Sequence, residues 1–401
     1  MDACSVVCFD TRDDLKVFQE IAAVVDRKNP HRRHLILSKV TGKHVAASTD
    51  EVTLWGNRLT SLIASQPALI DAAPNCVGVL GFAETATGLA AQVAEGLNAE
   101  VLAQSTRDSE GLSNPLRFSE AHSHAPTIFI SRQAIAHLAH VNHIVIVDDE
   151  LTTGSTLLNL IDLLRGRGLQ QPITAACLVD ARPAHHRDRF SKFESTANWD
   201  PTTVVALCRA VISEEGLPSD PLTPVSVQNT QDHNEQSPPP NVLGVLTTAV
   251  PIPDTRYGVG LSRRACFQAL ESFGENLRTD HGWANPLVLG LEEEVFPAYL
   301  LSRGLRADVQ CTTRSPIRCH TLGSYPIRSA AMCSSVINSS EKAFLYNVSP
   351  DHGEHTYSDV VIVDVQRHRN SQVHPSVLRA AGRISAKLWI VQIPTYIDIP
   401  R

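Results

Sequence analysis

Short apolar runs alternate with longer amphipathic segments along the first half of the chain. The runs are rich in Val, Ile and Leu, which is typical of strands buried on both faces, and the segments between them repeat apolar positions at helical spacing. The expected strands are 34–40, 76–82, 100–106, 127–131, 143–149, 173–180 and 202–207, and the expected helices include 55–72, 85–97 and 153–166. This alternation predicts an α/β fold, a mostly parallel sheet with flanking helices.

The second half of the chain shows the same kind of pattern. Its expected strands are 286–292, 307–313, 342–348, 359–365 and 386–393, and a helix is expected over 292–305, with Pro297 in its first turn. Between the halves, a stretch rich in Pro, Ser, Gln and Asn holds too few large apolar side chains to offset the entropy of ordering. We expect a first domain over 1–212, a flexible linker over 213–241 and a second α/β domain over 242–401, with no internal repeat evident.

The composition narrows the class of protein. Hydrophobic residues make up 43% and charged residues 19% of the chain, which is typical of globular proteins, and the formal net charge of -7 argues against a nucleic-acid partner. Nine scattered cysteines favour reduced thiols over disulfides, and Cys311, Cys319 and His320 lack the spacing of a zinc site. No signal peptide or apolar run of membrane length is evident, so we expect a cytoplasmic location and no membrane partner.

The strongest candidate site lies at the end of the apolar run 143–149. Adjacent carboxylates there can accept hydrogen bonds from two neighbouring sugar hydroxyls. The polar turn that follows, at the start of a predicted helix, offers backbone N–H groups and the helix dipole to a phosphate. The acids are Asp148, Asp149 and Glu150, and the turn is Thr152, Thr153, Gly154, Ser155 and Thr156. This arrangement suits a ribose 5-phosphate, and its alternative is a helix cap beside a solvated acidic turn.

The sequence VIVDDELTTGST, residues 145–156, resembles the binding signature for 5-phosphoribosyl-1-pyrophosphate (PRPP) in type I phosphoribosyltransferases. A Thr-Arg-Ser-Pro motif also occurs at 313–316. Together with the segments 37–45, 80–90, 105–107 and 118–125, these motifs make the chain similar to the phosphoribosyltransferases of tellurite-resistance and other stress operons. In those proteins a domain named after the TRSP motif follows the transferase domain.

The resemblance implies an Mg²⁺-dependent enzyme of nucleotide metabolism that transfers the phosphoribosyl group of PRPP to a nucleobase-like acceptor and releases pyrophosphate. Asp148, Asp149 and Glu150 would bind the ribose, and the residues 152–156 would bind the 5′-phosphate. The carboxylates of Asp148 and Asp149 would also contribute to the metal site, with Asp149 taking part in catalysis. Homodimers are common in the family that the chain resembles.

Basic residues elsewhere are candidates for binding pyrophosphate. Lys39, Gly42 and Lys43 lie in the loop after the strand 34–40, and Arg107 follows the strand 100–106. The basic groups can neutralise a leaving pyrophosphate, and Gly42 permits a tight turn. The alternative for the two lysines is an exposed surface turn.

The long polar loop 106–125 is expected to close over the site and exclude water. It carries Glu120, His122 and His124, which are candidates for proton transfer, although a solvated loop is the alternative. In the segment after the strand 76–82, two further polar residues are expected near the base or the metal unless they only cap a helix; they are Glu84 and Thr85.

The TRSP motif itself combines hydroxyl groups with a guanidinium group. Thr313, Arg314 and Ser315 can therefore form a clamp for phosphate or carboxylate. We expect the second domain to form part of the acceptor pocket or a second ligand site. The main alternative to an enzyme is a regulatory protein that senses PRPP without turnover. PRPP synthesis is a weaker alternative because the chain shows no ATP-binding pattern.

Overall fold

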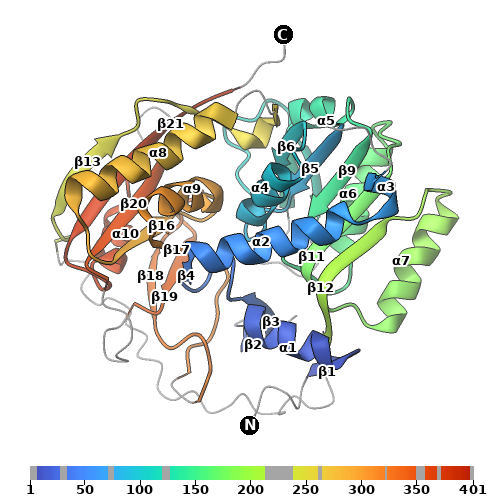
Figure 1. Cartoon of the computed structure of the whole chain (residues 1–401), viewed down its shortest axis with the longest axis horizontal. Coiled ribbons are helices and arrows are strands. Elements are labelled where there is room, and N and C mark those ends of the chain that lie inside the picture. The colour runs from blue at the N-terminus through green and yellow to red at the C-terminus, as the bar shows by residue number, and fades with distance from the viewer. Residues whose placement is uncertain are drawn as a thin grey trace.

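Two mixed α/β domains lie side by side, each built on its own sheet (Figure 1). The computed structural model describes residues 7–27, 34–70, 76–119, 127–212, 238–260, 264–320, 323–348, 357–367 and 372–397. The expected α/β fold with mostly parallel sheets and flanking helices is therefore confirmed. No helix in these ranges has both the length and the apolar character that a membrane crossing requires.

The first sheet has a parallel core with an antiparallel strand at each edge. Its strands, in spatial order, are β1 (Val7–Phe9), β12 (Thr203–Ile212), β11 (Ile173–Asp180), β9 (His143–Val147), β5 (Val77–Gly81), β6 (Val101–Gln104) and β15 (Val259–Gly260), with β10 (Glu150–Leu151) also paired to β11. Every residue of β5, β9 and β11 is buried, which explains why these strands appear in the sequence as continuous apolar runs. The helices of this domain are α1 (Arg12–Ile21), α2 (Thr49–Ala64), α3 (Pro67–Ile70), α4 (Thr87–Gly96), α5 (Arg132–Leu138), α6 (Ser155–Arg165) and α7 (Ala184–Thr196).

The second sheet follows the same plan. Its strands, in spatial order, are β13 (Val242–Thr247), β21 (Leu388–Tyr396), β20 (Asp359–Gln366), β16 (Pro286–Gly290), β17 (Asp308–Cys311) and β4 (Ala47–Ser48), with β14 (Ile252–Pro253) also paired to β21. All pairings are parallel except that of β4. The helices are the short 3₁₀ helix η3 (Thr255–Tyr257), α8 (Arg264–His281), α9 (Val295–Leu305) and α10 (Pro375–Ala381).

The two domains exchange edge strands. β4 comes from the first half of the chain and pairs with β17 of the second sheet, whereas β15 comes from the second half and pairs with β6 of the first. Both pairings are antiparallel, and each covers the open edge of a parallel sheet. Each domain therefore completes the sheet of the other.

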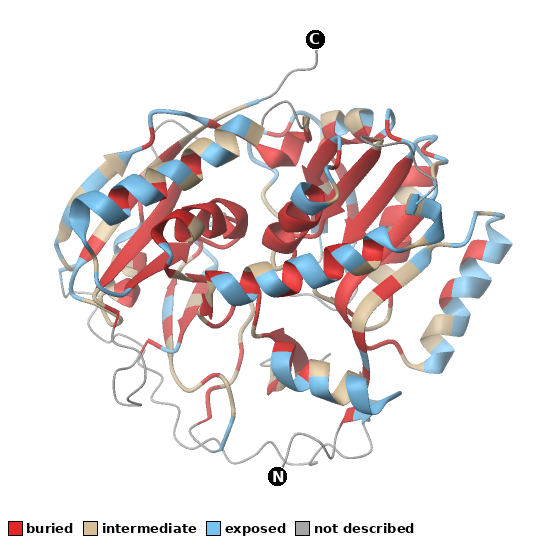
Figure 2. Cartoon of the chain, viewed as in Figure 1, coloured by how far each residue is buried: buried red, intermediate tan, exposed pale blue. Residues whose placement is uncertain are grey.

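A continuous apolar core joins the two sheets. The helices α4 and α9 pack against each other at its centre, and every residue of α9 except Arg303 is buried (Figure 2). Gly88 of α4 makes this approach possible, because a Cβ atom there would lie 2.8 Å from Cγ1 of Val295. A helix that is apolar on all sides is expected only in such a fully buried place.

Several boundaries differ from those expected. The segment 34–40 forms β3 (His34–Ser38), which pairs with β2 (Ala22–Asp26) in a separate hairpin and is not part of the parallel sheet. Helix α2 begins earlier than expected because Ser48 and Glu51 form a capping box. Helix α9 begins only after the turn 292–294. Of the expected linker, residues 213–237 lie outside the described residues.

Besides β2–β3, two further antiparallel hairpins stand outside the main sheets. One consists of β7 (Leu116–Ser119) and β8 (Thr127–Ile130), and the other of β18 (Ala330–Ser334) and β19 (Lys342–Tyr346). An isolated β-bridge links each hairpin to the segment after the edge strand of its own domain, Thr106 with Phe129 in the first and Thr313 with Phe344 in the second.

Candidate active site

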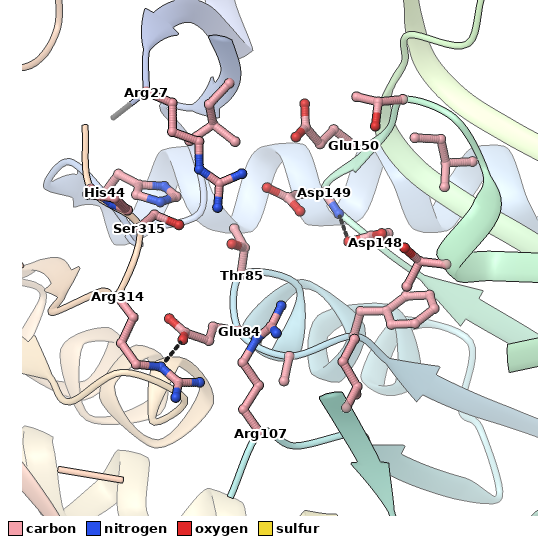
Figure 3. A pocket seen from close by; sticks show the side chains of 18 of the residues that line it. Arg27, His44, Glu84, Thr85, Arg107, Asp148, Asp149, Glu150, Arg314 and Ser315 are labelled. Atoms are coloured by element: carbon pink, nitrogen blue, oxygen red, sulfur yellow. Dashed lines mark hydrogen bonds and ion pairs between the residues drawn. The ribbon is translucent and has the colours of Figure 1, made fainter. Parts of the chain in front are cut away.

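A cavity of about 600 Å³ opens between the two domains, beyond the carboxyl ends of β5 and β9. In open parallel sheets, ligands bind at this edge because the loops that follow the strands converge there. The first domain contributes the loops after β5, β6 and β9, and the second domain contributes the TRSP segment and part of the hairpin β18–β19 (Figure 3). The site is therefore shared by both halves of the chain.

The acidic residues predicted from the sequence line one side of this cavity. Asp148 and Asp149 follow β9 directly, and the backbone N–H of Asp149 donates to Oδ1 of Asp148 at 2.9 Å. Glu150 lies at the start of β10, and its Oε2 accepts a hydrogen bond from the backbone N–H of Ile36 at 3.3 Å. Glu150 thus ties the hairpin β2–β3 to the rim of the site, while the two aspartates face the cavity (Figure 3).

The polar turn after β10 forms the next part of the wall. Four of its five residues line the cavity, and Ser155 is the first residue of α6. Gly154 has φ 75°, and a Cβ atom there would lie 3.0 Å from the ring of Phe190. Only glycine adopts this conformation without strain, so Gly154 sets the turn that presents the N-terminus of α6 to the cavity. The geometry is that of an anion site at a helix start.

The loop after β5 places a carboxylate between positive charges. Oε1 of Glu84 accepts a hydrogen bond from Nε of Arg314 at 2.8 Å, and Oε2 lies 3.2 Å from Nζ of Lys43. Burial alone would raise the pKa of Glu84, but the charges of Lys43 and Arg314 hold it well below its usual range. Thr85 beside it also lines the cavity. Glu84 is therefore ionised and joins the two domains.

Arg107 enters the cavity from the loop after β6 (Figure 3). Its backbone is held by Glu293, a residue of the second domain that the sequence did not single out. Oε1 of Glu293 accepts from the backbone N–H of Arg107, and Oε2 accepts from the hydroxyl of Thr106, both at 2.6 Å. Because Glu293 is buried, these bonds have little competition from water.

The TRSP motif reaches the cavity through only part of its length. Arg314 and Ser315 line it, whereas Thr313 is buried in the bridge to Phe344. Besides Glu84, the guanidinium of Arg314 lies 3.4 Å from Glu292 and 3.3 Å from Glu341. Arg314 thus holds together carboxylates from both domains at the wall of the site.

His44 is a second residue that the sequence did not single out. It lines the cavity next to Ser315 and is only 2% exposed (Figure 3). Neither ring nitrogen has a hydrogen-bond partner among the described residues. Burial and the nearby charge of Lys43 lower the pKa of His44 to about 3, so its ring is neutral at physiological pH. A neutral imidazole can donate one hydrogen bond and accept another.

The lysines predicted to bind pyrophosphate do not line the cavity. Lys43 is fully buried and donates to the carbonyl groups of Thr312, at 2.9 Å, and Glu292. Lys39 donates to the carbonyl of Gln19. The expectation placed their loop after a strand of the parallel sheet, and this is wrong because β3 belongs to a separate hairpin.

The same loop instead connects the two domains. Gly42 has φ 63°, and a Cβ atom there would lie 2.9 Å from the carbonyl oxygen of Val309 in β17. The tight turn expected at Gly42 is therefore present, but it serves domain packing. The proposed proton-transfer residues Glu120, His122 and His124 lie outside the described residues.

Comparison with protein families defines the class of this protein. Residues 21–211 match the family model of a phosphoribosyl transferase, and residues 254–380 match the model of the TRSP domain that lies C-terminal to it. The two matches include every residue that lines the cavity, whereas the strands β1, β13, β14 and β21 lie outside them. The chain is an enzyme of the phosphoribosyltransferase class, and it belongs to the family in which a TRSP domain follows the transferase domain.

Several solved structures are similar to the chain. Adenine phosphoribosyltransferase of Trypanosoma brucei, in complex with AMP, pyrophosphate and ribose-5-phosphate, is 16% identical over 53% of this chain and 86% of that chain, with a TM-score of 0.35. The enzyme of Leishmania tarentolae is 15% identical over 53% and 92%, with a TM-score of 0.35. The enzyme of Giardia lamblia, complexed with 9-deazaadenine, is 15% identical over 50% and 98%, with a TM-score of 0.34. A search of curated proteins finds no match.

Proposed function

We propose that the chain transfers the phosphoribosyl group of PRPP to a nucleobase-like acceptor, with release of pyrophosphate. The observation that supports this most directly is that the aspartates after β9 and the anion site at the start of α6 line one cavity. The aspartates would bind the ribose hydroxyls, and the turn at Gly154 would bind the 5′-phosphate. These two groups fix the sugar with C1 toward the middle of the cavity.

In the proposed reaction, a nitrogen atom of the acceptor forms a bond to C1 of the ribose. The bond from C1 to the pyrophosphate oxygen breaks, its electron pair leaves with pyrophosphate, and the acceptor nitrogen gives up its proton to the leaving group or to water. Arg107 enters the cavity where the leaving group would develop negative charge, beside the loop that carries Thr85. The protein's task is to hold the reactants in line and to stabilise that charge.

Mg²⁺ fits the chemistry of the acidic side of the cavity. Asp148 and Asp149 both line it, and carboxylate oxygens are ligands that Mg²⁺ prefers. The described residues contain no cluster of three or more metal-ligating side chains, so the phosphate oxygens of PRPP would supply the remaining ligands. The bound ion would neutralise charge on the pyrophosphate.

The acceptor would bind at the end of the cavity opposite the 5′-phosphate turn. His44, Arg27 and Ser315 line that end (Figure 3). A neutral imidazole with two unused nitrogens suits the alternating donors and acceptors at the edge of a nucleobase. Because Ser315 belongs to the TRSP motif, the second domain would help to select the acceptor. The stress-linked role and the homodimer, which the resemblance implies, remain predictions, and so does the cytoplasmic location.

A direct test measures pyrophosphate release from PRPP with Mg²⁺ and a panel of nucleobases. We expect release that depends on one class of base and is lost in Asp149→Asn. The control is Asp162→Asn, which removes the same charge from an exposed position on α6. Tight PRPP binding without pyrophosphate release for any base would favour the alternative, a regulatory protein that senses PRPP without turnover. Absence of PRPP binding would refute the proposal.

A further inference from the structure

The second domain repeats the local architecture of the first. In each, a buried strand that ends in glycine leads into a buried helix and then into a parallel neighbour strand, β5–α4–β6 in one and β16–α9–β17 in the other. The terminal glycine pairs with the last residue of the neighbour, Gly81 with Gln104 and Gly290 with Cys311. Both glycines admit the following helix, because a Cβ atom would lie 2.5 Å from that of Ala90 and 3.0 Å from that of Ala298.

The hydrogen bonds around these strands repeat at the same offsets. Ser105 donates its backbone N–H to the carbonyl of Gly81 at 2.9 Å, and its hydroxyl accepts from the backbone N–H of Ala83 at 3.0 Å. Thr312 makes the same two bonds, to the carbonyl of Gly290 and from the N–H of Glu292, both at 3.0 Å. Two unrelated βαβ units share a topology, but they have no reason to share a side-chain bond at a fixed offset.

The residue after Ser105 and the residue after Thr312 extend the correspondence. Thr106 and Phe129 exchange backbone hydrogen bonds of 2.9 and 2.7 Å, and Thr313 and Phe344 exchange bonds of the same lengths. In both domains, the phenylalanine lies in the second strand of a hairpin, β8 or β19. The segments Ser-Thr-Arg at 105–107 and Thr-Thr-Arg at 312–314 therefore occupy equivalent places.

The contacts between the repeats are reciprocal. Glu84 and Glu293 each lie three residues after the strand-ending glycine. Glu84 accepts from the side chain of Arg314, while Glu293 accepts from the backbone of Arg107, its counterpart. The exchanged edge strands, β4 on β17 and β15 on β6, are reciprocal in the same way. Such pairs are expected when two copies of one fold meet about an approximate two-fold axis.

Among the described residues, only one of the two equivalent sites is open. By strand register, Asp148 and Asp149 after β9 correspond to Asp364 and Val365 of β20, and Oδ2 of Asp364 accepts from the side-chain amide of Gln366. The space beside Val365 holds ion pairs in which Arg256 and Arg367 contact Asp254. About 10 Å³ of cavity remains there, compared with about 600 Å³ in the first domain. That volume admits no more than a single water molecule.

We infer that the TRSP domain is a second copy of the phosphoribosyltransferase fold that has lost its own ligand site and completes the site of the first copy. Within this arrangement, Glu293 is a positioning residue that acts through Arg107. The inference rests on the proposed function, because it assigns Arg107 to the pyrophosphate end of PRPP. It explains why both a glutamate and an arginine are present at equivalent places in each half.

The first experiment measures the stoichiometry of PRPP binding to the full chain by titration calorimetry in the presence of Mg²⁺. We expect one PRPP per chain and no residual binding in Asp149→Asn. Two PRPP molecules per chain, or one that persists in Asp149→Asn, would show that the second copy keeps a working site and would overturn the inference. No binding to the wild-type chain would refute the proposed function, and the inference would fall with it.

The second experiment tests Glu293 with a double-mutant cycle. Glu293→Gln is expected to weaken pyrophosphate binding by about tenfold or more, because a charge-assisted hydrogen bond to the backbone of Arg107 is lost. In an Arg107→Ala background, the same change is expected to have no further effect on pyrophosphate binding. Glu275→Gln, at an exposed position on α8, removes the same charge from the same domain and serves as the control.

An equal loss of pyrophosphate affinity in both backgrounds would show that Glu293 acts independently of Arg107 and would overturn this part of the inference. Full affinity in Glu293→Gln would overturn it as well. Wild-type pyrophosphate and PRPP affinity is measured alongside, so that a failure of the proposed function is seen separately from a failure of the cycle.

Discussion

The side chains of Glu84 and Arg314, which are 9% and 10% exposed, form an ion pair across the domain boundary, with 2.8 Å between Oε1 and Nε. Arg314 also lies near Glu292, so its removal takes a counter-charge from Glu84, which keeps Lys43, and the counter-charge of the buried Glu292. We expect Arg314→Met to lower the free energy of unfolding by about 3–5 kcal/mol. Denaturant unfolding of the full chain measures this.

The matched control is Arg189→Met, which removes the same charge from an exposed position on α7 and is expected to change stability by less than about 0.5 kcal/mol. The double variant Arg314→Met with Glu292→Gln should recover part of the loss, because the fully buried carboxylate that has lost its counter-charge is then neutral. Equal stability of Arg314→Met and Arg189→Met would contradict the structural role of the pair.

The glycine turn allows a second prediction with an internal control. Gly154 and Gly168 have similar positive φ angles, 75° and 85°, but only a Cβ atom on Gly154 would meet neighbouring side chains. Alanine at either position should destabilise the chain by about 1–2 kcal/mol through backbone strain. Only Gly154→Ala should also weaken PRPP binding, by about tenfold or more, because the N–H groups of the turn move. Titration calorimetry measures PRPP binding to both variants. Equal PRPP affinity of Gly154→Ala and Gly168→Ala would contradict an anion site at the turn.

His44 leads to a prediction in which stability and function move in opposite directions. Its ring is buried and unpartnered among the described residues, so His44→Leu should raise the free energy of unfolding by about 1 kcal/mol. The same variant should raise KM for the acceptor by about tenfold and leave PRPP affinity unchanged. The side chain of His44→Gln keeps a hydrogen-bond donor and an acceptor, so its acceptor KM should lie between those of the wild type and His44→Leu. An unchanged acceptor KM in His44→Leu would remove His44 from the acceptor site.

Glu292 should make stability depend on pH. Burial, with the negative charge of Glu84, raises the pKa of Glu292 from 4.5 to about 7. The folded chain therefore holds a proton there that the unfolded chain has released, so stability falls as pH rises from about 4.5 to about 7. Glu292→Gln should remove this loss of stability, which is on the order of 3 kcal/mol in the free energy of unfolding over that pH range. Denaturant unfolding at several pH values measures this dependence. The same change of the free energy of unfolding with pH in the variant and the wild type would contradict the raised pKa of Glu292.

The sequence predicted those parts of the site that are contiguous in the chain. Asp148, Asp149 and the turn around Gly154 follow one buried strand. Because these residues are close together in the sequence, they also lie close together in the structure. Lys39 and Lys43 were placed wrongly because the apolar run before them looks the same in a hairpin as in a parallel sheet. Periodicity reports burial, and it carries no information on which strands pair.

Residues that act across the domain boundary were missed for a related reason. Glu293 meets Arg107 and His44 meets the TRSP segment only after two sheets have packed together, and no local pattern reports such contacts. A signal was nevertheless present in the sequence. The strand-ending glycines at 81 and 290 are followed at similar distances by an apolar helix, a second strand and a Thr-Arg pair, which is the pattern of an internal repeat.

The exchange of β4 and β15 has a consequence for how this protein can change over generations. Each half carries a two-residue strand that is useful only to the other half, and without it the neighbouring sheet would present a bare edge to other chains. A gene fragment that encodes either half alone would therefore yield an aggregating product. We therefore expect the two halves to be kept in one chain, and transfer of the TRSP domain to an unrelated enzyme to be disfavoured unless the partner strand is transferred with it.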